Sequence, residues 1–366
     1  MTGRVRAAMI GTGAWAKVLA TAACGSRVEL VRCFSPNAQR RAAFAEATGI
    51  AAVDAIERIL DDATIDAVVI AAPNELHRPL ADAAARHGKH VFVEKPIAHT
   101  IVDALAMIET ARAHGTILVV GHCARMLAGN RAIARAIAQG ELGRVAHIEA
   151  YYANDRGLKL TPGDWRWYDE KAPGGPLSQI GIHQFDTLRA LGGDLVAVSA
   201  RSAKLSPAGA EVADQWVVGI RFADGKLGSL VTSWTSPGHY SVRATGERAS
   251  LYYEVDQALW SQPSRLHEHA VLERQARGDG PGARTRLPLA QGDMFRDELE
   301  LFAEAVTSAG ECELSAHNGL RALAAVEAAI ASDARGGAEV GLDEVVAAAQ
   351  RRTSGASPRP DLAPTK

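Results

Sequence analysis

Cysteine is scarce in this chain of 366 residues, and the common metal-binding motifs are missing. The four cysteines, Cys24, Cys33, Cys123 and Cys312, lie far apart, and neither a C-x-x-C pair nor an H-E-x-x-H motif occurs. This pattern argues against a disulfide-stabilised secreted scaffold and against a zinc site. We therefore expect reduced thiols, no metal ion and a cytoplasmic protein.

The chain also lacks a strong net charge and any long apolar run. Its formal net charge of −2 gives no electrostatic attraction to nucleic acid or to an anionic membrane. No segment approaches the ~20 apolar residues of a membrane-spanning helix. The basic, Ala-rich N-terminus is interrupted by Lys17 and by a glycine turn, which argues against a signal peptide. With 47% hydrophobic residues the chain can bury a large core, and its length suggests two domains.

A glycine-rich turn follows the first apolar segment. Val5 to Ile10 has the pattern of a buried strand, and Gly11-Thr12-Gly13-Ala14-Trp15-Ala16 follows it and opens a helix. This is G-x-G-x-x-A, a permitted variant of the dinucleotide-binding fingerprint. The glycines allow a tight turn and close approach of a pyrophosphate, and the helix N-terminus favours its charge. The order of strand, turn, helix and second strand favours nucleotide binding over an ordinary turn.

The end of the second strand, Val28 to Phe34, should carry the residue that binds the adenosine ribose. NAD-binding proteins usually place Asp or Glu there, but this chain has Ser35 followed by Arg40 and Arg41. A serine with following arginines suits the 2′-phosphate of NADP better than a free hydroxyl group. We therefore predict NADP(H), with NAD(H) as the alternative if the two arginines are only solvated residues of the next helix.

Further apolar segments alternate with helical ones, as in a parallel, doubly wound sheet. Ile65 to Ala72 ends in Pro73-Asn74, and Val91 to Val93 ends in Glu94-Lys95-Pro96. Such sheets bind ligands at the carboxyl ends of their strands, so Glu94 and Lys95 should enter a cleft. A surface ion pair beside a turn is the alternative. The pattern predicts a dinucleotide-binding Rossmann domain, residues 1–122, with six strands.

The pattern changes beyond residue 122. From Val196 to Tyr253 apolar and polar residues alternate in short segments separated by glycine turns, which predicts an open, mostly antiparallel sheet. We predict an α/β protein in which residues 123–350 form an α+β substrate and oligomerisation domain, and we expect residues 351–366 to be a disordered tail. An uncovered apolar face of that sheet would mark a subunit interface, so we predict a homodimer or homotetramer.

Five signals in chain order resemble a known family. They are the glycine turn, Pro73-Asn74-x-x-His77, Glu94-Lys95-Pro96, Gly174-Gly175…Gly181-x-His183-x-x-Asp186, and the helical segment Leu320 to Ala331. Together they are similar to the glucose–fructose oxidoreductase, inositol dehydrogenase and rhizopine catabolism (Gfo/Idh/MocA) family, over roughly residues 4–345. The resemblance implies NAD(P)-linked oxidation or reduction of sugar-like hydroxyl groups, with Lys95 and His183 facing the reacting carbon.

The same resemblance implies where the cofactor binds. The glycine turn would hold the pyrophosphate, and Pro73 and Asn74 would line the nicotinamide ribose. Ser35 and Arg40 resemble the serine and arginine of NADPH-using members. The implied cofactor-binding residues are Gly11, Thr12, Gly13, Ala14, Trp15, Ser35, Arg40, Ala72, Pro73, Asn74, His77, Glu94 and Lys95.

One position departs from the family pattern. Many dehydrogenases of this family carry Asp four residues before the histidine, where this chain has Gln179. Glutamine can hydrogen-bond a substrate hydroxyl group but cannot take a proton. We therefore expect acid–base catalysis from Lys95 and His183, or from His183 alone. Because residues i and i+4 share a helix face, the side chain of Gln179 should point where His183 points.

Four further residues are candidates for substrate binding: Arg156, Trp165, Arg166 and Asp186. Tryptophan stacks on sugar rings, but a role in the core or at an interface is at least as common. Asp186 would orient His183 or bind a hydroxyl group, unless it is an ordinary acid of the helix surface. His77 and His122 follow strand ends near the cleft, where we expect structural hydrogen bonds from them.

Three classes of function are compatible with these motifs. The first is an oxidoreductase that transfers a hydride to or from a small sugar, polyol or cyclic diol. The second is a nicotinamide-dependent hydrolase of the glycosidase type, and the third is a non-catalytic NAD(P)-binding sensor. The intact Glu94-Lys95-Pro96 motif together with His183 argues against the sensor, because a sensor needs no proton donor.

Overall fold

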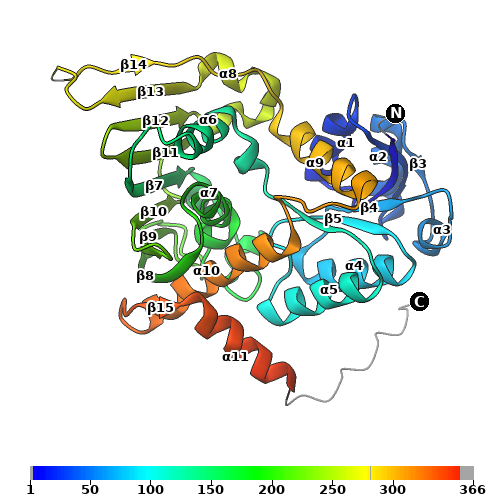
Figure 1. Ribbon diagram of the computed structural model, residues 1–366. Helices are drawn as coiled ribbons and strands as arrows, with labels where there is room; N and C mark the ends of the chain where they lie inside the picture. Colours follow the sequence, from blue (N-terminus) through cyan, green and yellow to red (C-terminus); the bar gives the residue numbers. More distant parts are fainter. Residues whose placement is uncertain (1–2, 281, 355–366) are drawn as a thin grey trace.

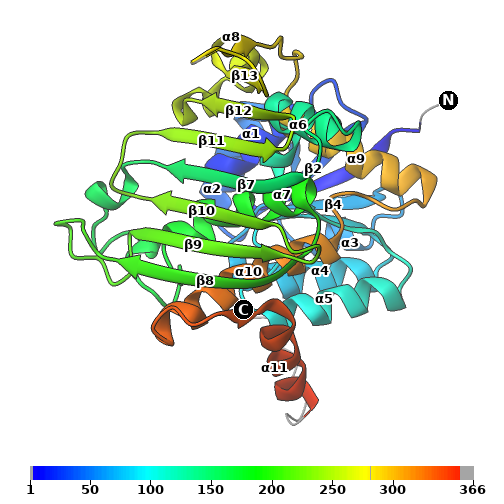
Figure 2. The same cartoon turned by 60° about the vertical axis from the view of Figure 1, so that its left-hand side comes forward.

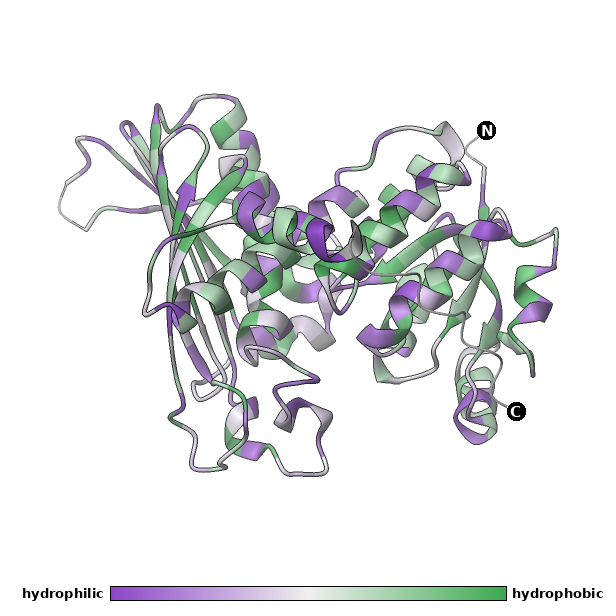
Figure 3. Ribbon diagram, turned by 90° about the horizontal axis from the view of Figure 1, so that it is seen from below, coloured by the Kyte–Doolittle hydropathy of each residue, from purple (hydrophilic) through white to green (hydrophobic). Residues whose placement is uncertain are grey.

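The computed structural model describes residues 3–280 and 282–354, which form two sheets with their helices (Figure 1). The first sheet has six strands in the order β3-β2-β1-β4-β5-β6, and the second has nine in the order β14-β13-β12-β11-β7-β10-β9-β8-β15. Hydrophobic residues run along the strands of both sheets, whereas hydrophilic residues gather on the outer helix faces and loops (Figure 3). In the described part of the chain no helix is both long and apolar enough to cross a membrane.

The N-terminal unit alternates strands and helices as the sequence predicts. Its elements are β1 (Val5–Ile10), α1 (Ala14–Ala23), β2 (Val28–Phe34), α2 (Ala38–Thr48), β3 (Ala51–Ala52), α3 (Glu57–Leu60), β4 (Ala67–Ile70), η1 (Asn74–Leu76), α4 (His77–Arg86), β5 (His90–Glu94), α5 (Ile101–Ala113) and β6 (Leu118–Gly121). All its strands pair in parallel. The strand order is that of the doubly wound Rossmann fold, so the loops after β1, β4 and β5 lie at one edge.

Side-chain caps fix where the helices at this edge begin. Asn37 accepts a hydrogen bond from the backbone N–H of Arg40 at the start of α2. At the start of α5, Thr100 accepts from the N–H of Asp103 and donates its hydroxyl proton to the Asp103 carboxylate at 2.8 Å. This reciprocal pair satisfies backbone donors that the helix itself leaves unpaired. It also fixes the end of the loop that carries Lys95.

The C-terminal unit is built around the larger sheet. Its elements are η2 (Cys123–Met126), α6 (Ala128–Ala138), β7 (Val145–Ala153), η3 (Arg156–Lys159), η4 (Trp165–Trp167), η5 (Leu177–Gly181), α7 (Ile182–Gly192), β8 (Leu195–Ala203), β9 (Gln215–Phe222), β10 (Leu227–Ser233), β11 (His239–Gly246), β12 (Ala249–Val255), η6 (Gln257–Ser261), η7 (Pro263–Arg265), α8 (Leu266–His269), β13 (Val271–Ala276), β14 (Thr285–Arg286), α9 (Met294–Ser308), α10 (Ala316–Ala334), β15 (Val340–Gly341) and α11 (Leu342–Ser354).

The centre of this sheet differs from the sequence-based prediction. β7 lies between β10 and β11, so the sheet begins well before Val196, where we had placed its first strand. β7 pairs in parallel with β10, and the other pairings are antiparallel. The prediction of an open, mostly antiparallel sheet is confirmed, but its central strand, β7, was not among the predicted strands.

Helices cover only one face of the larger sheet. α6, α7 and α10 pack on the face that carries Ile148, Leu230 and Val242, all of them buried. The opposite face is free of helices and turns toward the viewer in Figure 2. Its outward side chains are mixed rather than uniformly apolar as expected, because an ion pair between Glu149 and Arg243 lies among the apolar residues.

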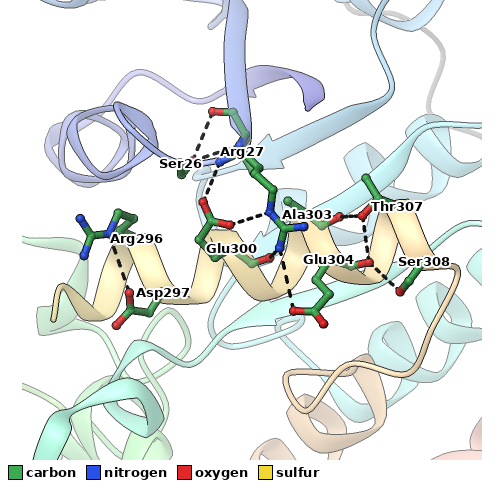
Figure 4. Close-up of polar contacts among 10 residues, drawn as sticks. Ser26, Arg27, Arg296, Asp297, Glu300, Ala303, Glu304, Thr307 and Ser308 are labelled. Carbon is green, nitrogen blue, oxygen red and sulfur yellow. Dashed lines mark hydrogen bonds and ion pairs between the residues drawn. The ribbon is translucent and has the colours of Figure 1, made fainter. Parts of the chain in front are cut away.

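Helix α9 returns from the C-terminal part of the chain to the N-terminal unit, where it packs against α1 (Figure 4). Arg27 binds this helix: its backbone N–H and its Nε donate to the two carboxylate oxygens of Glu300, each at 2.7 Å. Phe295 of α9 meets the ring of Trp15 edge-on at 5.2 Å. A helix distant in sequence thus forms one wall beside the glycine turn.

The end of the chain requires a correction. α11 continues to Ser354, so residues 351–354, which we expected to begin a disordered tail, are helical. The remainder of that predicted tail, residues 355–366, lies outside the described residues.

Candidate active site

Lys95 joins the two units at the carboxyl end of β5. The strand pairs with β4 and β6 over buried apolar residues, which carries Lys95 to the sheet edge. Its Nζ donates a hydrogen bond to the main-chain carbonyl of Gln179, at 2.7 Å. Gln179 belongs to the π-helical turn η5 that leads into α7, so the lysine reaches across to the C-terminal unit.

The surroundings of Lys95 bring its titration close to neutral pH. Burial lowers the pKa of Lys95 from its ordinary 10.5 to about 8. The neighbouring Glu94 opposes this shift and raises that pKa, whereas the positive charges of Arg166 and Arg156 lower it further. An amine that exchanges its proton near ambient pH is suited to general acid–base catalysis.

His183 lies in the first turn of α7 and is almost completely buried. Its ring stands perpendicular to that of His122, with 5.9 Å between the ring centroids, and also meets Trp260 edge-on at 6.2 Å. Burial lowers the pKa of His183 well below 6.5, and the charges of Lys95 and His122 act in the same direction. The Nδ1 atom has no hydrogen-bond partner among the described residues, so an imidazolium ion would leave a buried donor unpaired. His183 is therefore neutral around pH 7.

Gln179 lies in the π-helical turn η5, four residues before His183 in the first turn of α7. Its side-chain Oε1 accepts a hydrogen bond from Nε of Arg166 at 3.3 Å. Gly175 fixes the entry to this turn, because its φ is +53° and a Cβ there would lie 2.3 Å from the carbonyl oxygen of Ala213.

Asp186 has a different partner from the two that the sequence suggested. Its carboxylate is fully buried and is bound by Arg125, whose Nε donates to Oδ2 at 2.9 Å and whose second nitrogen donates to Oδ1 at 2.5 Å. A third guanidinium N–H donates to the carbonyl of Glu313 at 2.6 Å. Both oxygens of Asp186 are thus engaged with Arg125, which fixes η2 to α7 behind His183.

His77 is completely buried and connects two loops of the cleft. Its ring nitrogens lie 2.9 Å from the carbonyl oxygen of Pro96 and 3.0 Å from that of Ala72. The ring therefore fixes the loop after β4 against the loop of Lys95. These are the structural hydrogen bonds expected of His77, and they leave no ring nitrogen free for the direct cofactor contact that the family resemblance implies.

Glu94 and Trp15 connect the glycine turn to the strand of Lys95. Nε1 of Trp15 donates to Oε1 of Glu94 at 2.5 Å. Burial raises the pKa of Glu94 to about 7, against the opposing effects of Trp15 and Lys95. Glu298 of α9 is a neighbour that the sequence did not reveal, because it comes from a distant helix. Both its oxygens are buried without a partner among the described residues, and burial raises its pKa well above the usual range.

The glycine turn fits the pyrophosphate of a dinucleotide. Gly11 has a φ of +101°, and a Cβ there would lie 2.2 Å from the carbonyl oxygen of Ala71, so no other residue fits. A Cβ on Gly13 would meet nothing within 4 Å, which leaves open space in front of α1. The N-terminus of α1 has no side-chain cap, and Oγ1 of Thr12 is buried without a partner. These unpaired donors suit an anion at the helix N-terminus.

Ser35 and Arg40 follow β2, at the position where the sequence predicts binding of the adenosine ribose. Ser35 is buried directly after β2, and the guanidinium group of Arg41 donates to its carbonyl oxygen. Arg41 is thereby fixed to the loop. Arg40 is exposed in the first turn of α2, and its side chain has no hydrogen-bond or ion-pair partner in the described part of the chain. The two arginines that the sequence could not distinguish therefore have different surroundings.

The remaining predicted residues lie around Lys95 and Gln179. The guanidinium group of Arg166 stacks on the ring of Trp165, 4.1 Å from its centroid. Arg156 begins η3 directly after β7 and has an exposed side chain. A cavity of about 520 Å³ adjoins this region, and its lining includes Asn74, Pro96 and Ser178.

Both units of the chain match known protein families. Residues 5–122 match the model of the oxidoreductase family with an NAD-binding Rossmann fold, and residues 130–252 match that of the GFO/IDH/MocA C-terminal domain. The chain is 32% identical over 316 residues to 1,5-anhydro-D-fructose reductase of Ensifer adhaerens, covering 84% of this chain and 90% of that protein. It is 31% identical over 350 residues to inositol 2-dehydrogenase of Rhizobium meliloti, covering 90% of this chain and 96% of that protein.

Solved structures of other proteins share the fold of this chain. A protein of Desulfitobacterium hafniense, provisionally assigned as an NADPH-dependent oxidoreductase, superimposes with a TM-score of 0.91 at 33% identity, covering 94% of this chain and 100% of that one. An aldose–aldose oxidoreductase of Caulobacter crescentus in complex with glycerol gives a TM-score of 0.80 at 27% identity, covering 92% and 99%.

Proposed function

Because the chain belongs to the Gfo/Idh/MocA family of NAD-binding oxidoreductases, we propose that it transfers a hydride between NADP(H) and a secondary hydroxyl or carbonyl group of a sugar, polyol or cyclic diol. The protein is an NAD(P)-dependent dehydrogenase or reductase acting on CH–OH groups. The observation that carries the finer proposal is the position of Lys95, which leaves the Rossmann sheet, contacts the turn before His183 and titrates near neutral pH.

Lys95 and His183 divide the proton chemistry between them. In the oxidation the neutral amine of Lys95 takes the hydroxyl proton, and in the reduction its ammonium group returns that proton to the oxygen. His183 stays neutral, because burial holds its pKa well below 6.5, and donates a hydrogen bond to the same oxygen. The cofactor supplies the hydride acceptor or donor. Its pyrophosphate would be held by the glycine turn, and its 2′-phosphate by Ser35 and Arg40.

A substrate screen tests the proposal. Sugars, inositols and dihydrodiols are incubated with NADP⁺ or NAD⁺, and the absorbance at 340 nm is followed. We expect reduction of the nucleotide with at least one class of polyol. Cleavage of a glycoside without a net change at 340 nm would support the hydrolase instead, and tight cofactor binding with no turnover of any compound would support the sensor.

Replacing Arg40 by alanine is expected to weaken NADP⁺ binding about 10- to 100-fold and to change NAD⁺ binding little. Arg40 is exposed and free to contact a phosphate group, and a charge-assisted hydrogen bond is one of the stronger polar contacts. Dissociation constants from fluorescence titration check this. Arg86→Ala on α4 is the control, because Arg86 is also exposed but lies away from the 2′-phosphate position. Equal losses for both cofactors, or a wild-type preference for NAD⁺, would contradict the assignment.

The pH dependence should identify the group with the pKa of about 8. Oxidation needs the unprotonated amine of Lys95, so its kcat/KM should rise as the pH increases through about 8, and that of reduction should fall over the same range. A carboxylate near Lys95 stabilises the ammonium form and raises its pKa. Gln179→Asp should therefore move both curves to higher pH, whereas Gln179→Asn should leave them in place. A shift to lower pH for Gln179→Asp would contradict the proposed role.

We propose that the open face of the larger sheet forms the interface of a homodimer or homotetramer. Val217 and Leu227 are each 58% exposed on this face, which is unusual for large apolar side chains. Val217→Arg is expected to shift the protein toward monomer in light scattering at micromolar concentration. Arg58→Glu, on an exposed position of α3, is the control. A wild-type protein that is already monomeric would contradict this proposal.

A further inference from the structure

Three cationic side chains lie in the proposed substrate site, and two of them contact one uncharged residue. Nζ of Lys95 donates to the main-chain carbonyl of Gln179 at 2.7 Å, and Nε of Arg166 donates to the side-chain oxygen of the same residue at 3.3 Å. Arg156 is the third, and its positive charge lowers the pKa values of both Lys95 and Arg166. Where many relatives place a carboxylate, this chain therefore has two arginines and an amide.

The acidic residues near these cations are engaged with other groups. Asp155 pairs with Lys159 at 2.6 Å. Oδ2 of Asp164 accepts hydrogen bonds from both the backbone N–H and the hydroxyl group of Thr161, each at 2.9 Å. In the described part of the chain the guanidinium group of Arg156 has no hydrogen-bond or ion-pair partner at all. Neither Arg156 nor Arg166 thus makes an ion pair within the described residues, although the charge of Asp164 acts on both from a greater distance.

Arg166 is the more buried of the two arginines, so its charge has the larger desolvation penalty. Burial lowers its pKa from 12.5 to about 10, and the charge of Arg156 adds to that shift. Its guanidinium group is nevertheless fixed in orientation, because it stacks on Trp165 and bonds Gln179 through Nε. Most N–H groups of this half-buried guanidinium group have no partner among the described residues. An anion that accepts hydrogen bonds from them would stabilise it.

From this arrangement we infer that the substrate carries an anionic group, a carboxylate or a phosphate, which Arg156 and Arg166 bind while the reacting hydroxyl group lies at Lys95. This inference rests on the proposed oxidoreductase function and narrows its substrate class. The fork of a guanidinium group matches two oxygens of a carboxylate or phosphate. Because Lys95 and Arg166 contact the same residue, the anionic group and the reacting carbon belong to one small molecule.

Direct binding tests the inference without turnover. The NADPH-loaded protein is titrated calorimetrically, at constant ionic strength, with D-glucose, D-glucuronate and D-glucose 6-phosphate. We expect at least one anionic compound to bind about 10- to 100-fold more tightly than glucose, and the better of the two identifies the anion. Arg156→Gln and Arg166→Gln should remove most of this preference, and Arg166→Lys should remove part of it. Arg156 is exposed, so its variant is expected to fold, and melting temperatures check both.

A control and a turnover assay separate the outcomes. Lys159→Gln removes a positive charge from the same short helix, but Lys159 is already paired with Asp155, so the preference should persist. The inference is overturned if glucose and both anions bind with equal affinity, or if Arg156→Gln weakens the binding of all three compounds equally. This holds even if neutral polyols reduce NADP⁺. Arginine-dependent anion binding with no change at 340 nm for any compound supports the anion site and overturns the proposed oxidoreductase function. If Arg156→Gln leaves the affinity for NADPH unchanged, Arg156 binds an anionic group of the substrate. If the variant weakens NADPH binding, Arg156 binds a phosphate group of the cofactor, which overturns the inference.

Discussion

Replacing Lys95 by methionine is expected to lower kcat by about 10³-fold or more while the affinity for NADPH stays close to that of the wild type. In the proposed mechanism the lysine both exchanges a proton and stabilises a developing alkoxide. General acid–base catalysis is typically worth ~10²- to 10⁴-fold, and a single donor to an oxyanion ~10²- to 10³-fold. Methionine keeps the apolar stem of the side chain, and the glycine turn proposed to hold the pyrophosphate is a separate loop. Steady-state kinetics and fluorescence titration check the two expectations.

Lys89 offers a matched control for that substitution. It is also a buried lysine, and its Nζ donates to the carbonyl oxygens of Asp62 and Ile65 at 2.7 and 2.8 Å. Lys89→Met should therefore lower the melting temperature by leaving two carbonyls unpaired, with kcat per folded molecule unchanged. If Lys95→Met kept a near-normal kcat, the Glu94-Lys95-Pro96 motif would be only the end of a structural strand.

The Rossmann half of the fold was predictable because its signals are local. Each buried strand is a short apolar run, and each ends in residues with a distinct role, such as Gly11 or Lys95. In a parallel sheet these ends meet at one edge whatever the exact bounds of the strands. The glycine turn and Lys95 therefore come to one region through topology alone, and the structure confirms the parallel, doubly wound sheet.

The larger sheet was harder to predict because its centre depends on pairing distant in sequence. β7 lies between two strands that follow it by many residues, and its outward positions carry His147 and Glu149. Polar residues on the open face make the segment resemble a charged surface loop. The return of α9 to the N-terminal unit is equally non-local, since it depends on the contacts of Arg27 with Glu300.

Within the site, the residue types were predicted but not their hydrogen-bond partners. Asp186 was assigned to substrate or to His183, yet the buried Arg125, 61 residues away in sequence, binds both its oxygens. The π-helical form of the turn that carries Gln179, and the hydrogen bond from Arg166 to its side chain, had no signal in the sequence. The pKa values of Lys95 and His183 are set mainly by burial, which a sequence does not state.

Replacing His183 by asparagine is the second substitution with a large expected effect, a decrease in kcat of about 10²- to 10³-fold. The histidine is expected to hold the reacting oxygen by one hydrogen bond, and loss of one such donor has that magnitude in other enzymes. The shorter amide is not expected to reach the same oxygen. Melting temperature and NADPH binding should change little, because Nδ1 of His183 makes no hydrogen bond within the described residues. His87→Asn, an exposed histidine at the end of α4, is the control.

The pH profile of this variant separates the two catalytic residues. Because burial and the charge of Lys95 hold the pKa of His183 well below 6.5, the histidine does not change its charge between pH 7 and 9. The residual oxidation rate of His183→Asn should therefore still rise through about pH 8, where Lys95 loses its proton, whereas the residual rate of Lys95→Met should be flat there. The opposite result, a flat profile for His183→Asn and a rise for Lys95→Met, would make His183 the proton carrier and leave Lys95 to hold the oxygen.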